Sequence, residues 1–186
     1  MTTRWRGIVL ARHGETDDNR EPIRVQGFTD TPLNDTGCRQ AQELSVRVAE
    51  RGVRSLWSSD LSRARETAEI VGRTIHLTPR LDARLREASR GRWEGSRFID
   101  IEREDPEGYA AWRRAGAQFR FPGGESLLEQ QQRVSAALDD VAAQGELPAL
   151  VVCHGGSIRV VLCLFDPRGL DAFHEFDVPN VGLAEL

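Results

Sequence analysis

Two short apolar runs indicate the strands at the centre of the predicted fold. Ile8–Ala11 and Ala149–Cys153 contain no polar or charged residue and are too short for ordinary helices, which is typical of strands buried on both faces. Each run ends at a glycine-containing turn, at Arg12–Thr16 in the first case and His154–Gly156 in the second. We therefore predict two central strands, each followed by a functional loop.

The first predicted helix starts at Thr36 as its N-cap. Ala41, Leu44 and Val48 recur at spacings of three and four and so share one face, and Gly52 ends the helix. The residues before it, Asp17–Pro32, have no clear period and predict a long loop, which in a compact domain is usually functional.

A second strand and helix follow directly. Residues 54–58 predict a strand, and residues 58–60 offer cap residues for a helix whose apolar stripe is Leu61, Ala64, Ala68 and Val71. The unit of strand, turn and helix is therefore repeated.

The remaining elements complete an α/β pattern. They are a short strand and connection over 77–85, helical insertions over 91–124, a helix from the capping box Ser126–Glu129 towards Ala143, a helix over 157–165 and an edge strand over 181–186. Strands that alternate with helices predict a three-layer α/β/α sandwich with a mainly parallel sheet. We expect one domain over 1–186, with 91–124 as a lid or wall over the active site.

Composition and charge exclude several classes of protein. Apolar residues make up 39% of the 186 residues and charged residues 29%, which are globular proportions. The net charge is −4, and no basic block is present to bind nucleic acid or an anionic membrane. Cys38, Cys153 and Cys163 have no metal-ligand or disulfide spacing, and the N-terminus has no secretion signal, so we expect a cytoplasmic protein. No oligomeric state is indicated.

The charged residues after the predicted strands indicate a phosphate site. Arg12 and His13, Arg63, and His154 follow three strands whose carboxyl ends should meet at one edge of the sheet, and Glu87 comes from another connection. Guanidinium groups and helix N-termini both suit phosphate oxygens. Arg63 also lies in a predicted first helical turn, where the helix dipole disfavours a cation, so a bound anion would explain its position.

Several motifs together resemble the histidine phosphatase, or phosphoglycerate mutase-like, superfamily. They are Leu10–Thr16 followed by Asn19, Gln26-Gly27, Ser58–Ala64 with Thr67-Ala68, Leu85–Glu87, Trp93–Gly95, Pro122–Ser126 and His154–Gly156. They occur in the family's order and at its spacing over nearly the whole chain. The resemblance implies an enzyme that transfers a phosphoryl group through a phosphohistidine.

The same resemblance implies a role for each matched residue. His13 would be the nucleophile, while Arg12, Arg63 and His154 would hold the phosphoryl oxygens. Asn19, Gln26, Gly27 and Gly155 would line the rest of the phosphate site. Glu87 would act as acid and then base, which predicts a carboxyl pKa raised towards neutrality. The resemblance implies no metal and no cofactor, and a small phosphomonoester as the partner.

Three alternatives remain at this point. The segment Cys153-x5-Arg159 has the spacing of cysteine-dependent phosphatases, although Val160 lacks their usual hydroxyl. A mutase would use the same phosphohistidine, but the segment after Glu87 lacks the tyrosine common in mutases, and Gly156 stands where they tend to have asparagine. A non-catalytic phosphate-binding protein is the third alternative. We predict a phosphatase, in which water accepts the phosphoryl group.

Overall fold

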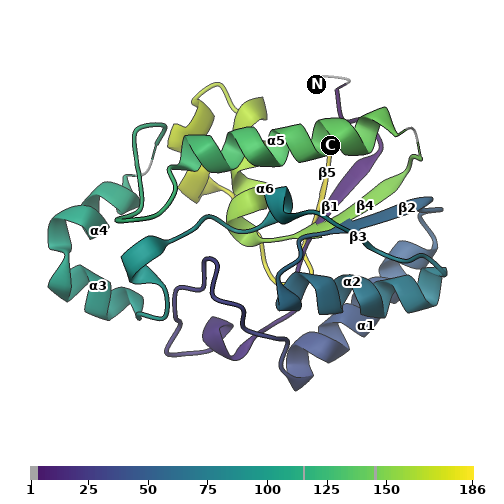
Figure 1. Cartoon of the computed structure of the whole chain (residues 1–186), viewed down its shortest axis with the longest axis horizontal. Helices are drawn as coiled ribbons and strands as arrows, with labels where there is room; N and C mark the ends of the chain where they lie inside the picture. The colour runs from purple at the N-terminus through teal and green to yellow at the C-terminus, as the bar shows by residue number, and fades with distance from the viewer. Residues whose placement is uncertain (1–3, 115, 145) are drawn as a thin grey trace.

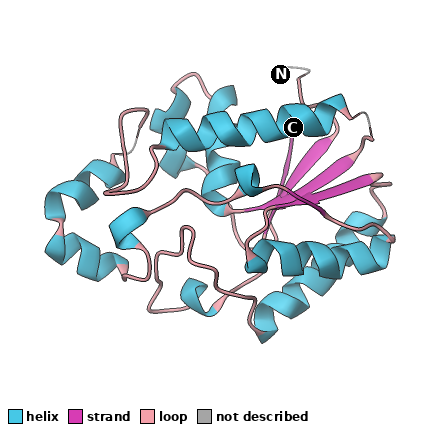
Figure 2. Ribbon diagram, viewed as in Figure 1, coloured by secondary structure: helices cyan, strands magenta, loops and turns pink. Residues whose placement is uncertain are grey.

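The protein is an α/β sandwich around a five-stranded sheet in the strand order β3-β2-β4-β1-β5 (Figures 1 and 2). The computed structural model describes residues 4–114, 116–144 and 146–186. The strands are β1 (Ile8–Arg12), β2 (Ser55–Ser58), β3 (Arg80–Leu81), β4 (Ala149–Cys153) and β5 (Leu183–Glu185). The predicted fold class, with its mainly parallel sheet, is confirmed.

The register of the parallel strands brings the functional loops together. β1 pairs with β4 so that Arg12 lies opposite Cys153, and β2 pairs with β4 so that Ser58 lies opposite Val152. The residues that follow these positions therefore emerge side by side at the carboxyl edge of the sheet, where ligands bind in open parallel sheets. β5 runs antiparallel to β1 and forms the edge strand that the sequence predicts.

Helices cover both faces of the sheet (Figure 1). α1 (Asp35–Ala49) and α2 (Ser62–Ile75) pack against one face, and α5 (Leu127–Ala143) and α6 (Gly155–Leu162) against the other. Successive side chains of β1 point to opposite faces of the sheet. Val9 packs in the hydrophobic cluster under α1 and α2, and Leu10 packs in the cluster under α5 and α6. Alternate residues of one strand thus supply both halves of the core.

Several aromatic residues that follow Glu87 in the chain pack into a separate cluster. α3 (Phe98–Glu104) and α4 (Pro106–Arg113) lie to the side of the sheet, at the left of Figure 1. Trp93 contacts Trp112 and Phe121 edge-on, and the ring of Phe98 stacks on Trp112 at a centroid distance of 5.0 Å. This packing fixes the N-terminal end of α3 beside the candidate site. None of the helices in the described ranges is long and apolar enough to cross a bilayer.

The starts of three helices, α1, α2 and α6, differ from the sequence predictions. The N-cap of α1 is Asn34, whose side chain accepts from the N–H of Gly37, so α1 starts one residue before the predicted cap, Thr36. α6 starts at Gly155, two residues earlier than predicted. α2 starts at Ser62, after the predicted cap residues, and its terminal N–H is bound by Asp30, at 2.6 Å from Ser62 N and 2.9 Å from Ser62 Oγ. A cap that is 32 residues away in the chain leaves no local signal.

Replacing Asp30 by alanine should destabilise the protein by about 1 kcal/mol, the usual effect of losing an N-cap acceptor. Asp30→Asn keeps one acceptor oxygen and should lose less. Urea unfolding midpoints of the two variants and the wild type measure the difference. An Asp30→Ala midpoint equal to that of the wild type would show that the cap contributes nothing.

Candidate active site

A cavity of about 180 Å³ opens at the carboxyl edge of the sheet, and most of the predicted site residues line it. These are Arg12, His13, Asn19, Gln26, Gly27, Arg63, Glu87 and Gly155. His154 is not in the lining but lies fully buried beside it, with its ring centroid 5.2 Å from that of His13. The residues proposed from sequence are therefore gathered in one place, although they come from six separate segments of the chain.

His13 is held in one orientation and one protonation state. Its Nδ1 lies 2.7 Å from the carbonyl oxygen of Gly14, which can only accept, so Nδ1 carries the proton and Nε2 keeps its lone pair. Burial first, and then the charges of Arg63 and Arg12, lower the pKa of His13 well below 6.5. The imidazole is therefore neutral at neutral pH, as a nucleophile must be.

Two guanidinium groups near His13, that of the half-buried Arg12 and that of the buried Arg63, are fixed by backbone carbonyls. Arg12 donates from Nη1 to the Val178 carbonyl at 2.7 Å. Arg63 donates to the carbonyls of Thr29 and Gly27 at 2.9 and 2.8 Å. Burial lowers the pKa of Arg63 to about 10, so the side chain still carries its charge at neutral pH. Nε of each arginine is buried without a hydrogen-bond partner among the described residues.

His154 presents a third free donor. Its Nε2 lies 2.8 Å from Ser59 Oγ, which accepts from the N–H of Leu61 and can therefore donate its own hydrogen to the histidine. That arrangement puts the ring proton on Nδ1, a buried atom that has no partner within the described ranges. Burial, followed by the charge of Arg63, lowers the pKa of His154 well below 6.5 as well.

Glu87 departs from the sequence expectation. Its carboxylate accepts hydrogen bonds from the N–H of Ala88 (2.9 Å), the N–H of Gly156 (2.9 Å) and the amide of Gln130 (2.8 Å). Burial raises its pKa, but the charge of Arg90 and these three donors outweigh burial and lower the pKa to about 2. The predicted rise towards neutrality is therefore wrong for the free protein, in which Glu87 is ionised.

The other predicted binding residues are built into the loop that closes the cavity. Asn19 accepts from the N–H of Thr16 at 3.2 Å, and the Gln26 amide donates to the Thr16 hydroxyl. Gly27 has a φ of 56°, and a Cβ there would lie 2.4 Å from an oxygen of Glu94. Glu94 accepts from the N–H groups of Phe28 and Arg90, so it holds the loop.

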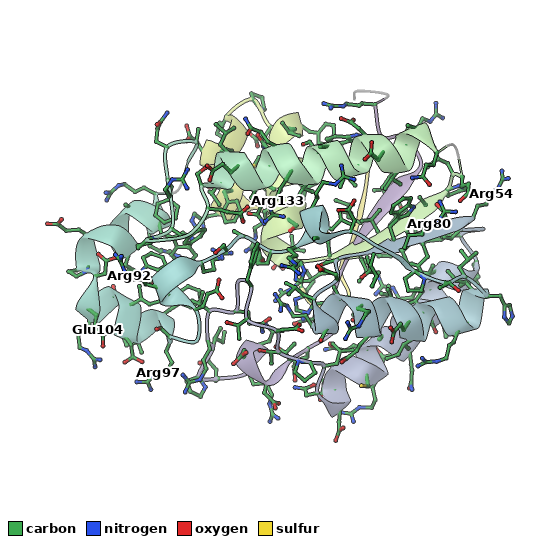
Figure 3. All side chains as sticks on the ribbon, in the orientation of Figure 1. Arg54, Arg80, Arg92, Arg97, Glu104 and Arg133 are labelled. Atoms are coloured by element: carbon green, nitrogen blue, oxygen red, sulfur yellow. The ribbon has the colours of Figure 1, made fainter. Side chains whose placement is uncertain are left out.

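Sequence reasoning missed several residues of the site. Arg90, Arg159 and Phe98 line the cavity, and Arg24 lies at its exposed rim. Arg133 of α5, labelled near the centre of Figure 3, donates to the carbonyls of Arg84, Arg86 and Glu87 and so fixes the segment that carries the carboxylate. Arginine makes up all the basic residues of this chain, so an individual arginine in a helix or loop gives no distinguishing signal.

The cysteine alternative does not fit this geometry. Cys153 is a fully buried residue of β4 that packs in the core between the sheet and α5. Burial raises the pKa of its thiol to about 12, whereas a nucleophilic thiolate needs a lowered pKa. Arg159 donates from Nε to the Phe176 carbonyl at 2.9 Å, and its spacing from Cys153 reflects only the strand and helix that carry them.

The two buried neutral histidines predict a loss of stability in mild acid. Because the pKa values of His13 and His154 lie below 6.5 in the folded state, the unfolded chain binds more protons below that pH. Stability should therefore fall below pH 6.5 by about 1.4 kcal/mol per pH unit for each histidine. Urea midpoints between pH 7.5 and 5.0 measure this slope, and His13→Gln should reduce it. A flat profile in the wild type would contradict the buried neutral state.

Comparisons with known proteins agree with this geometry. The sequence profile of the histidine phosphatase superfamily (branch 1) matches residues 8–186. A protein from Escherichia coli named probable phosphoglycerate mutase GpmB is 41% identical over 154 residues, which is 80% of this chain and 69% of that protein.

Two solved phosphatases have the same fold. The mycobacterial glucosyl-3-phosphoglycerate phosphatase in complex with VO3 is 30% identical, with a TM-score of 0.85 over 95% of this chain and 90% of that one. The α-ribazole phosphatase from Shigella flexneri is 26% identical, with a TM-score of 0.82 over 95% and 87%. The likeness covers nearly all of this chain.

Proposed function

The chain belongs to the histidine phosphatase superfamily, and on that premise we propose that it hydrolyses a small phosphomonoester through a phosphohistidine on His13. One observation carries the proposal. Three N–H donors, Nε of Arg12, Nε of Arg63 and Nδ1 of His154, are buried without partners in the described chain, and they belong to residues next to His13, whose Nε2 is free. Buried donors are normally satisfied, and three phosphoryl oxygens would satisfy these.

The first half-reaction transfers the phosphoryl group to His13. The Nε2 lone pair attacks phosphorus, the bond to the ester oxygen breaks, and negative charge spreads over the three equatorial oxygens. Arg12, Arg63 and His154 meet this charge with donors that are already in position, so little reorganisation is needed. Asn19, Gln26, Gly27 and Gly155 enclose the phosphoryl group on its other sides.

Glu87 moves the proton that each half-reaction requires. A phosphomonoester loses its second proton near pH 6, so some substrate arrives as the monoanion. The negative charge of the bound phosphate raises the pKa of Glu87 above its value of about 2 in the free protein, so the proton of the monoanion can move to Glu87. Protonated Glu87 then donates to the departing ester oxygen. In the second half-reaction, Glu87 takes a proton from the water that attacks the phosphohistidine, and phosphate and free His13 result.

Mutase activity is the second candidate, because the curated relative named probable phosphoglycerate mutase GpmB is 41% identical to this chain. Hydrolysis is favoured by the two phosphatases of the same fold. It is also favoured by Gly156, because an added Cβ there would meet Glu87 Oε1, so the asparagine expected in a mutase would require the Glu87 carboxylate to move.

We assign residues 1–186 to one catalytic domain in which 91–124 form the wall of the cavity. The donors around His13 supply the charge stabilisation, so the proposed reaction uses no metal. Cys38, Cys153 and Cys163 are all free thiols, which supports a reducing compartment such as the cytoplasm.

Acceptor partitioning tests the proposal. With p-nitrophenyl phosphate in ¹⁸O-labelled water, each released phosphate should carry one labelled oxygen. Added glycerol should compete with water for the phosphoenzyme and yield glycerol phosphate. Isomerisation of 3-phosphoglycerate faster than its hydrolysis, with its bisphosphate present, would instead identify a mutase. Absence of any turnover or phosphoenzyme with either ester would refute both.

A further inference from the structure

The cavity carries more positive charge than a phosphoryl group can balance. Five arginines line it against the single carboxylate of Glu87: Arg12, Arg24, Arg63, Arg90 and Arg159. The proposed phosphoryl site uses Arg12 and Arg63, and a phosphomonoester brings at most two negative charges. Of the other three, Arg24 lies at the exposed rim and donates to the Gly95 carbonyl, whereas Arg90 and Arg159 lie deeper.

Arg90 is a buried cation with its donors unused. Its side chain is 12% exposed, and its guanidinium lies 4.2 Å from the centre of the Phe121 ring. Its Nη2 is 3.6 Å from Glu87 Oε1, beyond hydrogen-bond distance, and the guanidinium makes no hydrogen bond to the described residues. A guanidinium stacked on a ring keeps its N–H edge free for a carboxylate or phosphate. Burying a charge is costly unless a partner compensates it.

Arg159 brings a second guanidinium to the same cavity. It is anchored by the bond from Nε to the Phe176 carbonyl, and within the described chain its two terminal nitrogens make no hydrogen bond. Burial and the like charge of Arg159 lower the pKa of Arg90, while Glu87 raises it. Two cations that face one small cavity repel each other, and an anion between them would remove that repulsion.

The position of Glu87 says which part of the substrate would reach these arginines. Glu87 protonates the ester oxygen in the proposed reaction, so the leaving group lies next to the Glu87 carboxylate. Arg90 is beside the same carboxylate, with Nη2 at 3.6 Å from Glu87 Oε1. We propose that Arg90 and Arg159 form a second anion site that binds a carboxylate or a second phosphate on the leaving group. This inference rests on the proposed function. It defines the substrate class as small phosphomonoesters with another anionic group a few bonds from the ester oxygen.

A matched pair of esters tests the second anion site. 3-Phosphoglycerate and glycerol 3-phosphate are both esters of a three-carbon skeleton, and a carboxylate in the first replaces a hydroxymethyl group in the second. The wild type should hydrolyse 3-phosphoglycerate with a kcat/KM at least about tenfold higher, the expected contribution of one bidentate charged contact. The kcat/KM values of fructose 1,6-bisphosphate and fructose 6-phosphate are compared in the same way, to test whether a second phosphate is also preferred.

Single substitutions assign the preference to the two arginines. In Arg90→Gln and in Arg159→Gln, the ratio of the two kcat/KM values should fall towards one, mainly through a higher KM for the ester whose leaving group carries the additional anionic group. Arg113→Gln is the matched control, because Arg113 lies exposed on α4 and outside the lining of this cavity. It should keep the wild-type ratio. Calorimetric binding of both esters to His13→Ala gives the same comparison without turnover.

Two results would overturn the inference. One is equal kcat/KM values and equal affinities for the two members of both pairs in the wild type. The other is that both Arg90→Gln and Arg159→Gln keep the wild-type preference for the ester with the additional anionic group, while Arg90→Gln slows all esters equally. That result would make Arg90 only a counter-ion of Glu87. Hydrolysis and phosphoenzyme formation would persist in either case, so these results differ from a failure of the proposed function.

Discussion

Replacing His13 by alanine should lower kcat by about 10⁴ to 10⁶, the range found when a nucleophile is removed and only the binding donors remain. The reason is structural. The unprotonated Nε2 belongs to a histidine that lines the cavity together with Arg12 and Arg63, whereas the other histidine of the site, His154, has its Nε2 bound to Ser59 and its ring proton on Nδ1. His154 is therefore not free to replace the lost nucleophile.

Trapping of the intermediate measures the same loss directly. After rapid quenching of a reaction with ³²P-labelled ester, the wild type should carry an acid-labile, alkali-stable label, and His13→Ala should carry none. Cys153→Ala is the matched control, since it removes the thiol of the alternative mechanism, and it should keep both label and turnover. Label in His13→Ala together with its loss in Cys153→Ala would contradict the assignment.

Glu87→Gln should slow the hydrolysis of alkyl phosphates by about 10² to 10⁴, the usual contribution of general acid–base catalysis. Nitrophenolate needs no proton to leave, so formation of the phosphoenzyme from p-nitrophenyl phosphate should be much less affected. Attack by water still needs a base. We therefore expect a burst of nitrophenol equal to the enzyme concentration, followed by slow turnover and accumulation of phosphohistidine.

The pH dependence follows from the ionised state of Glu87. Because its pKa in the free protein is about 2, the proton for an alkyl leaving group must come with the substrate monoanion. The kcat/KM for alkyl esters should therefore fall as the pH rises above about 6, where the monoanion disappears. Glu43→Gln, an exposed change on α1, is the control. Equal losses in Glu87→Gln for alkyl and aryl esters, without a burst, would refute this role.

Local signals in the sequence were sufficient to predict the sheet and the residues around His13. The strands Ile8–Arg12 and Ala149–Cys153 contain the apolar runs Ile8–Ala11 and Ala149–Cys153, and a histidine follows each strand, so their pairing brings His13 near His154. Features that depend on distant residues were not predictable. The capping of α2 by Asp30 is one example.

The protonation state of Glu87 depends on contacts with residues far away in the sequence. An acid–base role predicts a raised pKa, but the segment gives no indication that Gly156, Gln130 and Arg90 will surround the carboxylate. Arg90 and Arg159 were also missed, because stacking on Phe121 and anchoring at Phe176 are contacts between residues far apart in the chain or on different elements.

The antiparallel pairing of β5 with β1 has a consequence for synthesis of the protein. Val181 donates its N–H to the carbonyl of Arg12, Gly182 accepts from the N–H of Arg12, and the side chain of Asn180 donates to the carbonyl of His13. The backbone on both sides of the nucleophile is thus held by residues that the ribosome adds about 170 positions later. A nascent chain that ends before Asn180 should have a loose His13 loop, so the proposed activity should appear only after residues 180–182 have been added and have folded onto β1.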